Sequence, residues 1–228
     1  VTIDEVVGQE HLTDPGKFLQ RMIGMDSATS LILYGPPGTG KTTLAQILAK
    51  SGGAKFIQLN ATSAGVTDMR KVIEEAKQTA RQFGRRTLLF IDEIHRLNKG
   101  QQDVLLPPVE NGTLQLVGAT TENPSFEVIS PLLSRCQVYI LQPMTDGELQ
   151  TLLDRALATD PELKTREIEV QETEALFRFS GGDARKLLNI LDIITGAADG
   201  KVTITNQYVT DCLQQNIALY DKNGEQHY

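Results

Sequence analysis

Residues 35–43, which read GPPGTGKTT, restrict the possible folds of this chain more than any other stretch. They follow an apolar run at 31–34 and precede a segment at 43–49 with the composition of a helix. The spacing G-x-x-x-x-G-K-[ST] between a strand and a helix is that of a phosphate-binding loop. Its glycines let backbone N–H groups converge on phosphate oxygens, and the helix N-terminus adds partial positive charge. The sequence therefore predicts a nucleoside triphosphate site, the alternative being a chance match.

Two side chains of this loop are predicted to act on the phosphates and their metal ion. Lys41 is placed to reach the β- and γ-phosphates, and the hydroxyl of Thr42 is placed to bind Mg²⁺. We expect the whole loop to contact the nucleotide, which gives the binding residues Gly35, Pro36, Pro37, Gly38, Thr39, Gly40, Lys41, Thr42 and Thr43.

A pair of acidic residues follows the apolar stretch 87–91. A fully apolar strand is typical of a parallel sheet buried on both faces, and ligands bind at the carboxyl ends of such strands. Asp92 would hold Mg²⁺, directly or through water, and Glu93 would polarise the attacking water as a general base. The pair favours a hydrolase over a kinase, and the alternative is an exposed acidic turn.

The order of strands and helices predicts an α/β fold. Short strand patterns alternate with helical ones as far as residue 141, which implies a parallel sheet flanked by helices. Residues 97–109 look helical, although Pro107 and Pro108 should end or kink that helix early. Beyond a boundary near Gln142 and Pro143, apolar residues recur at helical spacing.

Composition limits the classes of partner. The formal net charge of −7 argues against nucleic-acid binding through bulk charge, so any such contact must be local or come from assembled subunits. A small basic cluster at Arg81, Arg85 and Arg86 is either ordinary surface or a DNA contact. Cys136 and Cys212 form no C-x-x-C, so neither a disulfide framework nor a zinc site is indicated. Without a membrane-length apolar run or a signal-peptide pattern, we expect a cytoplasmic protein with no membrane partner.

Six short segments together resemble the AAA+ ATPases of the clamp-loader clade. They are Val7-Gly8-Gln9, residues 35–43, Asp92-Glu93, Gly118-Ala119-Thr120-Thr121, Ser134-Arg135-Cys136 and Gly182-Asp183-Ala184-Arg185. The longer string at 118–127, GATTENPSFE, is similar to the replication-associated recombination ATPases of the RarA/MgsA type, which are bacterial relatives of the Werner-helicase-interacting ATPases.

The resemblance implies roles for residues around the nucleotide. Val7 and Gly8 would cradle the adenine, the alternative being a simple packing turn at the start of the fold. Thr121, with Thr120 as a second candidate, would be the sensor that bonds the γ-phosphate or the attacking water. Asn60 would hold the catalytic Glu93 away until a ligand binds.

Two arginines complete the implied catalytic set. Arg135 matches the arginine finger, which reaches into a neighbouring subunit's site, although taken alone it would be an ordinary exposed arginine. Arg185, with Ala184 beside it, matches the second sensor, which contacts the γ-phosphate from the lid. A finger arginine can be worth 10³–10⁵ in rate.

The resemblance also implies an organisation and a function. Residues 1–142 would be the AAA+ nucleotide-binding domain, 143–217 a small all-helical lid, and 218–228 the start of a further C-terminal region, so that the chain is an ATPase core. The implied activity is Mg²⁺-dependent ATP hydrolysis by a homo-oligomer at stalled replication forks or DNA ends, stimulated by DNA. Single-strand/duplex junctions or ends, and single-stranded-DNA-binding protein, are the implied partners in a bacterial, nucleoid-associated setting.

Two other classes of function remain open. The chain would alternatively be an ATP-dependent remodeller or loader of a protein partner at the replisome, which the acidic composition favours. A passive nucleotide-binding module is the third hypothesis, and the intact pair Asp92-Glu93 argues against it.

Overall fold

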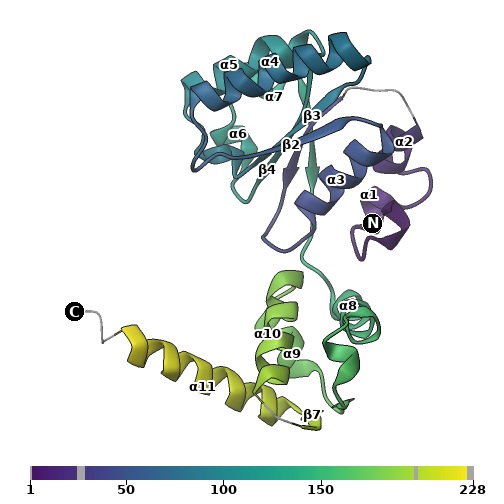
Figure 1. Ribbon diagram of the computed structural model, residues 1–228, viewed down its shortest axis with the longest axis vertical. Helices are drawn as coiled ribbons and strands as arrows, with labels where there is room; N and C mark the ends of the chain where they lie inside the picture. The colour runs from purple at the N-terminus through teal and green to yellow at the C-terminus, as the bar shows by residue number, and fades with distance from the viewer. Residues whose placement is uncertain (1, 25–28, 198–199, 225–228) are drawn as a thin grey trace. The chain divides into compact units, whose positions relative to one another are not determined.

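The computed structural model describes residues 2–24, 29–197 and 200–224 of the chain (Figure 1). The chain forms two compact units, Val1–Gln142 and Pro143–Tyr228. The first unit holds two clusters of buried apolar side chains and the second unit holds a third.

A five-stranded parallel sheet forms the centre of the first unit, with the strand order β2-β3-β4-β1-β5. Strands β1, β3 and β4 are buried almost throughout, as their apolar runs predict. The predicted α/β fold with a parallel sheet is therefore confirmed. The strands are β1 (Ser30–Tyr34), β2 (Lys55–Asn60), β3 (Thr87–Asp92), β4 (Leu114–Thr120) and β5 (Cys136–Ile140).

Helices cover both faces of this sheet (Figure 1). Because side chains alternate along a strand, Leu31 and Leu33 of β1 pack with the helices of one layer while Ile32 packs with the other layer. The first layer contains α1 (Glu10–Thr13), α2 (Phe18–Gly24) and α3 (Lys41–Ser51), and the second contains α4 (Val66–Phe83), α5 (Lys99–Glu110) and α7 (Ser130–Leu133). Short elements η1 (Ile3–Glu5), η2 (Ile94–Arg96) and α6 (Pro124–Glu127) complete the unit.

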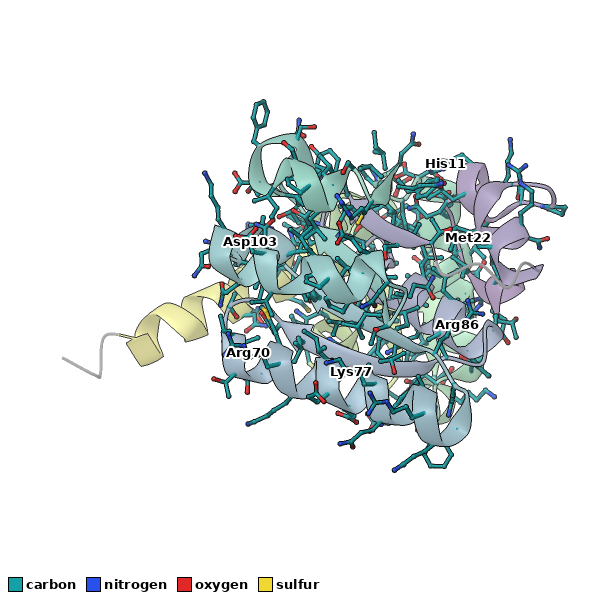
Figure 2. All side chains as sticks on the ribbon, turned by 90° about the horizontal axis from the view of Figure 1, so that it is seen from above. His11, Met22, Arg70, Lys77, Arg86 and Asp103 are labelled. Atoms are coloured by element: carbon teal, nitrogen blue, oxygen red, sulfur yellow. The ribbon has the colours of Figure 1, made fainter. Side chains whose placement is uncertain are left out.

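The labelled side chains of Figure 2 help to place the two layers. Arg70 and Lys77 lie along α4, and His11 and Met22 lie on the side of α1 and α2. Met22 is buried in the apolar cluster of the first layer, whereas Arg70 is exposed. The charged residues of α4 therefore form a solvated face, and its apolar residues Met69, Val72 and Ala76 pack on the sheet.

The carboxyl ends of the strands meet at one edge of the sheet. Tyr34 pairs with Thr120, and Asn60 pairs with Asp92. Since ligands bind at this edge in open parallel sheets, the register gathers the polar residues that follow β1, β3 and β4 on the side where a nucleotide is expected.

Helix α5 differs from the expectation that its prolines end it early. It runs from Lys99 through Pro107 and Pro108 to Glu110. Both prolines lie in the last turn and lack the N–H groups that would bond to Asp103 O and Val104 O, while the carbonyl of Pro107 still accepts from Asn111 N at 3.1 Å. The helix continues through them because this turn is packed: Pro108 is buried, Leu105 belongs to the apolar cluster of the second layer, and Val109 packs against that cluster.

The second unit is a small helical domain with one short strand pair. Its helices pack around a core that includes Leu149, Leu176 and Leu191. Strands β6 (Ile168–Val170) and β7 (Val202–Ile204) pair in parallel, which the sequence does not signal because three residues are too few to establish a period. The helices are α8 (Asp146–Thr159), η3 (Leu163–Thr165), α9 (Glu174–Ser180), α10 (Ala184–Gly196) and α11 (Asn206–Gly224).

The segment 218–228, expected to begin a further region, is described only in part. Helix α11 extends to Gly224, and residues 225–228 lie outside the described ranges. Within the residues that the structure describes, no helix combines the length and the apolar character needed to cross a membrane.

Gly118 in β4 provides a test of how tightly the first unit is packed. A Cβ at this position would lie 2.8 Å from Cδ1 of both Ile32 and Ile94, which are buried. We expect Gly118→Ala to lower the free energy of unfolding by about 1–3 kcal/mol through overpacking, measured by urea denaturation followed by circular dichroism. Gly100→Ala on α5 is the matched control, because the added Cβ meets only an ordinary contact at 3.5 Å. Equal stability of the two variants would contradict the described packing.

Candidate nucleotide-binding site

The loop after β1 is held against the sheet by its first residue. Gly35 N donates to Thr120 O at 3.1 Å, which continues the pairing of β1 with β4 into the loop. A Cβ on Gly35 would lie 2.4 Å from Leu141 O, so only glycine fits there. Gly38 and Gly40 have φ of 70° and 92°, values that favour glycine. The structure thus explains these three glycines, Gly35 by a close contact and Gly38 and Gly40 by their positive φ.

Lys41 lies across this loop. Its ammonium donates to Gly35 O at 2.8 Å and to Pro36 O at 2.7 Å, and the residue is only 7% exposed. Thr39 Oγ1 also donates to Pro36 O, at 2.9 Å. Lys41 opens α3, so its charge stands beside the helix N-terminus, where the helix dipole adds to the attraction for anions.

The residues expected to hold Mg²⁺ offer oxygen atoms, which this ion prefers. They are Thr42, half-buried in the first turn of α3, and Asp92 at the end of β3. Within the described residues the Thr42 hydroxyl has no hydrogen-bond partner, and Asp92 Oδ1 accepts only Glu93 N, at 3.1 Å. The described part of the chain contains no cluster of three or more His, Cys, Asp or Glu suited to a metal ion. This donor set fits an ion that takes its other ligands from phosphates and water.

Glu93 has a strained backbone. Its φ of 53° lies in the left-handed region, and among the described residues only Gln9 shares this property outside glycine. Such conformations cost of order 1–3 kcal/mol and gather at functional sites. The bond from Glu93 N to Asp92 Oδ1 supports the turn, which continues directly into η2.

A hydrogen-bond network joins η2 to the end of β4. His95 Nδ1 lies 3.0 Å from Thr120 Oγ1, and that hydroxyl also contacts Glu122 N at 3.0 Å and Glu122 O at 3.1 Å. A hydroxyl has one hydrogen, which Glu122 O accepts, so the ring nitrogen donates to Oγ1. Thr120 is 1% exposed and fully engaged, whereas Thr121 is exposed. Of the two sensor candidates, Thr121 is therefore the one with its side chain available to a ligand.

His95 is a residue of the candidate site that the sequence analysis did not single out. The residue is half-buried on η2 and bonded to a buried threonine at the candidate site. A lone histidine two positions after an acidic residue carries no pattern that reveals such a contact.

Asn60 and Gln9 form hydrogen bonds with other residues of the first unit. Asn60 Oδ1 accepts from Thr62 N at 2.9 Å and from Thr62 Oγ1 at 2.7 Å, so it stabilises the turn after β2. Its register places it beside Asp92. Val7 is half-buried and Gly8 buried, and the following Gln9 bonds to the backbone of Gln142. Their contacts with a nucleotide stay predictions.

Arg135 lies at the other end of the sheet from the loop. It directly precedes β5, whose first residue Cys136 pairs with Ser30 at the start of β1. Its guanidinium donates to Pro131 O and Ser134 Oγ and forms an ion pair with Glu110 at the end of α5. Arg135 is therefore not brought together with Lys41 or Asp92.

The segment 182–185 belongs to the second unit. Gly182 has a φ of 79°, and a Cβ there would lie 2.7 Å from Cβ of Pro143. Asp183 caps α10 by accepting from Arg185 N at 2.8 Å and Lys186 N at 3.2 Å. This cap places Arg185, which is exposed, and Ala184 in the first turn of α10. Their role as second sensor stays a prediction.

Two other features of the sequence have structural explanations. Arg85 donates to Gly53 O at 2.6 Å and Ala54 O at 3.1 Å, so part of the basic cluster stabilises a loop. Burial raises the pKa of the Cys136 thiol to about 12, which keeps it protonated and unsuited to act as a nucleophile.

Comparisons with known proteins identify the family. The family model described as "ATPase family associated with various cellular activities (AAA)" matches residues 31–144, and the model of the AAA C-terminal domain matches residues 162–228. The chain belongs to the AAA family of ATPases. The resemblance to the RarA and Werner-helicase-interacting ATPases is likewise confirmed by its relatives.

Two bacterial relatives and one eukaryotic relative illustrate this. The chain is 43% identical to replication-associated recombination protein A of Coxiella burnetii and 40% identical to that of Escherichia coli K12. It is 39% identical to the ATPase WRNIP1 of Dictyostelium discoideum. These alignments cover 99%, 98% and 99% of this chain but 52%, 52% and 28% of the relatives. The AAA chain thus spans about half the length of the bacterial relatives.

Solved structures support the same fold. The RuvB Holliday junction branch migration motor of Thermotoga maritima is 28% identical, with a TM-score of 0.70 over 93% of this chain and 71% of RuvB. Another RuvB chain from that organism, the A156S mutant, gives a TM-score of 0.73 at 27% identity. The AAA family and these neighbours imply that the chain binds a nucleotide.

The bond between His95 and Thr120 predicts a kinetic effect without a loss of binding. We expect His95→Ala to lower ATP turnover about ten-fold while KM for ATP stays unchanged, because the loop carrying Thr121 loses its anchor but the phosphate loop does not. The measurement is steady-state hydrolysis over a range of ATP concentrations. His95→Asn, whose amide can still donate, should recover most of the rate, and Arg96→Ala on the same turn is the control. A His95→Ala protein with wild-type turnover would show that the bond has no role in the reaction.

Proposed function

We propose that this chain is the ATPase core of an assembly that hydrolyses ATP during replication-associated recombination and repair, at stalled forks or DNA ends. The observation that supports hydrolysis is the shared edge of the sheet where Lys41, Asp92, Glu93 and Thr121 follow neighbouring strands. The names of the relatives support the DNA setting.

Each residue of this edge has a role in the proposed reaction. Backbone N–H groups of the loop and Lys41 bind and orient the phosphates, and Glu93 accepts the proton of the attacking water. Thr121 orients that water or the γ-phosphate. Thr42 and Asp92 would hold Mg²⁺, which neutralises charge that develops on the phosphate oxygens.

Arg135 supports a reaction that needs a second copy of the chain. Five paired positions of β1 and β5 separate it from the end of β1 that carries the loop, roughly 16 Å along the strands. This separation supports a role for Arg135 on a neighbour's phosphates rather than on those of its own subunit. Its ion pair with Glu110 is exposed, and such pairs contribute about 0–1 kcal/mol, so the pair does not prevent the guanidinium from turning to a new partner.

Mixing two inactive variants tests whether Arg135 acts between subunits. Arg135→Ala should lose at least about 10³-fold in turnover, and Glu93→Gln about 10²–10⁴-fold, when each is assayed alone. In a mixture, the intact Glu93 of an Arg135→Ala subunit can lie beside the intact Arg135 of a Glu93→Gln subunit. The rate of hydrolysis should therefore rise well above the sum of the rates of the two separate variants.

Arg70→Ala serves as the arginine control, since this exposed residue lies on α4 and should leave turnover unchanged. A mixture no more active than its separate components would exclude the action of Arg135 on a neighbouring site.

A protein-directed remodeller at the replisome is the second candidate function. The net charge of −7 supports it, because a strongly acidic chain gains little from phosphate contacts. The engagement of Arg85 with loop carbonyls further reduces the basic surface available to DNA.

The two candidates predict different responses of the full-length protein. For the fork ATPase, we expect DNA with a single-strand/duplex junction to raise ATP turnover several-fold over the rate without DNA, since DNA organises the assembly that joins finger and site. Blunt duplex and single strands of equal length are the controls. ATP turnover that is the same with and without each of the three DNAs would favour the protein-directed function.

A further inference from the structure

The side chain of Gln9 makes a pair of hydrogen bonds to one distant peptide unit. Its Nε2 donates to Gln142 O at 2.7 Å, and its Oε1 accepts from Gln142 N at 3.0 Å. The residue is 3% exposed and has a φ of 65°. The amide of this buried, strained glutamine thus pairs with the backbone N–H and the backbone C=O of Gln142, as a neighbouring strand would.

Gln142 is the last residue of the first unit, and the chain just before it is held from two further sides. His11 Nε2 donates to Ile140 O at 2.9 Å, and Leu141 N donates to Tyr34 O at 2.7 Å. Leu141 is 1% exposed in the apolar core. The exit segment, residues 140–142, is thus fixed by the start of the chain on one side and by β1 on the other.

The same exit segment contacts both segments that are expected to bind the nucleotide. Leu141 O leaves room only for glycine at Gly35, the first residue of the phosphate-binding loop. Gln9 directly follows Val7 and Gly8, the segment expected to cradle the base. Within the first unit, the exit segment therefore links the residues expected to hold the base with the phosphate-binding loop. The chain continues from this segment into the second unit.

We propose that Gln9 is a positioning residue that couples nucleotide binding to the exit segment. Nucleotide held by residues 7–8 and 35–43 stabilises the turn at Gln9, and the two amide hydrogen bonds transmit this order to Gln142. The coupling rests on the proposed function, whereas the bonds themselves do not.

Amide hydrogen exchange at Gln142 reports the coupling directly, because Gln9 accepts this amide hydrogen. Without nucleotide, the amide hydrogen of Gln142 should exchange at least about five-fold faster in Gln9→Met than in wild type, because one hydrogen bond is lost. The amide of Leu141, bonded to Tyr34 O, is the reference in the same segment and should change little. Adding the non-hydrolysable analogue AMP-PNP with Mg²⁺ should slow exchange at Gln142 in wild type but not in Gln9→Met.

Two further variants separate positioning from a general loss of structure. Gln9→Glu keeps an acceptor for Gln142 N and loses the donor to Gln142 O, so protection should be intermediate. His11→Ala removes a neighbouring contact but neither bond of Gln9, so the response of Gln142 to the analogue should persist.

The outcomes distinguish the coupling from the proposed function. Wild-type exchange at Gln142 that ignores the analogue, although the analogue binds by fluorescence competition, overturns the coupling alone. Failure of wild type to bind the analogue overturns the proposed function and the coupling together. Unchanged exchange in Gln9→Met without nucleotide shows that the bonds do not protect Gln142, which also overturns the proposal.

Discussion

The site depends on the two hydrogen bonds that extend the ladder of β1 beyond its last residue. Gly35 N bonds to the end of β4, and Tyr34 O accepts from Leu141 after β5. Strand β1 lies between these neighbours, so the phosphate-binding loop leaves the sheet from a fixed point with a fixed direction. Preorganisation of this kind matters because phosphoryl transfer gains its rate mainly from positioning and charge stabilisation.

Backbone strain occurs at two residues of the segments that are expected to bind the nucleotide. The two described non-glycine residues with positive φ, Gln9 and Glu93, lie far apart in the sequence of the first unit, and both belong to segments expected to bind the nucleotide. Each is supported by hydrogen bonds: Glu93 N donates to Asp92 Oδ1, and the side chain of Gln9 both donates to and accepts from the backbone of Gln142. Strained backbone of this kind gathers at functional sites, and in this chain it falls in the segments expected to bind the nucleotide.

The sequence predicted those parts of the molecule in which local chemistry determines local structure. Glycine spacing and apolar runs reveal the loop at 35–43 and the buried strands, because each needs particular residue types at fixed positions. The bond of His95 to Thr120 and the bonds of Gln9 to Gln142 join residues 25 and 133 positions apart. Such contacts depend on tertiary packing, which no local pattern contains, and the continuation of α5 through Pro107 and Pro108 likewise depends on the packing of its last turn.

The direction of the parallel strands has a consequence for how copies of the chain can associate. Strands β1 and β5 carry the phosphate-binding loop at one end and Arg135 at the other. If Arg135 acts on a neighbouring copy as proposed, the contact joins unlike ends and leaves one unused end on each outer copy. Such an interface would be head-to-tail and could not be satisfied by a two-fold symmetric dimer. Growth then stops only when the rotation between successive copies closes a ring, and the size of that ring is set by an angle rather than by the strength of the contact.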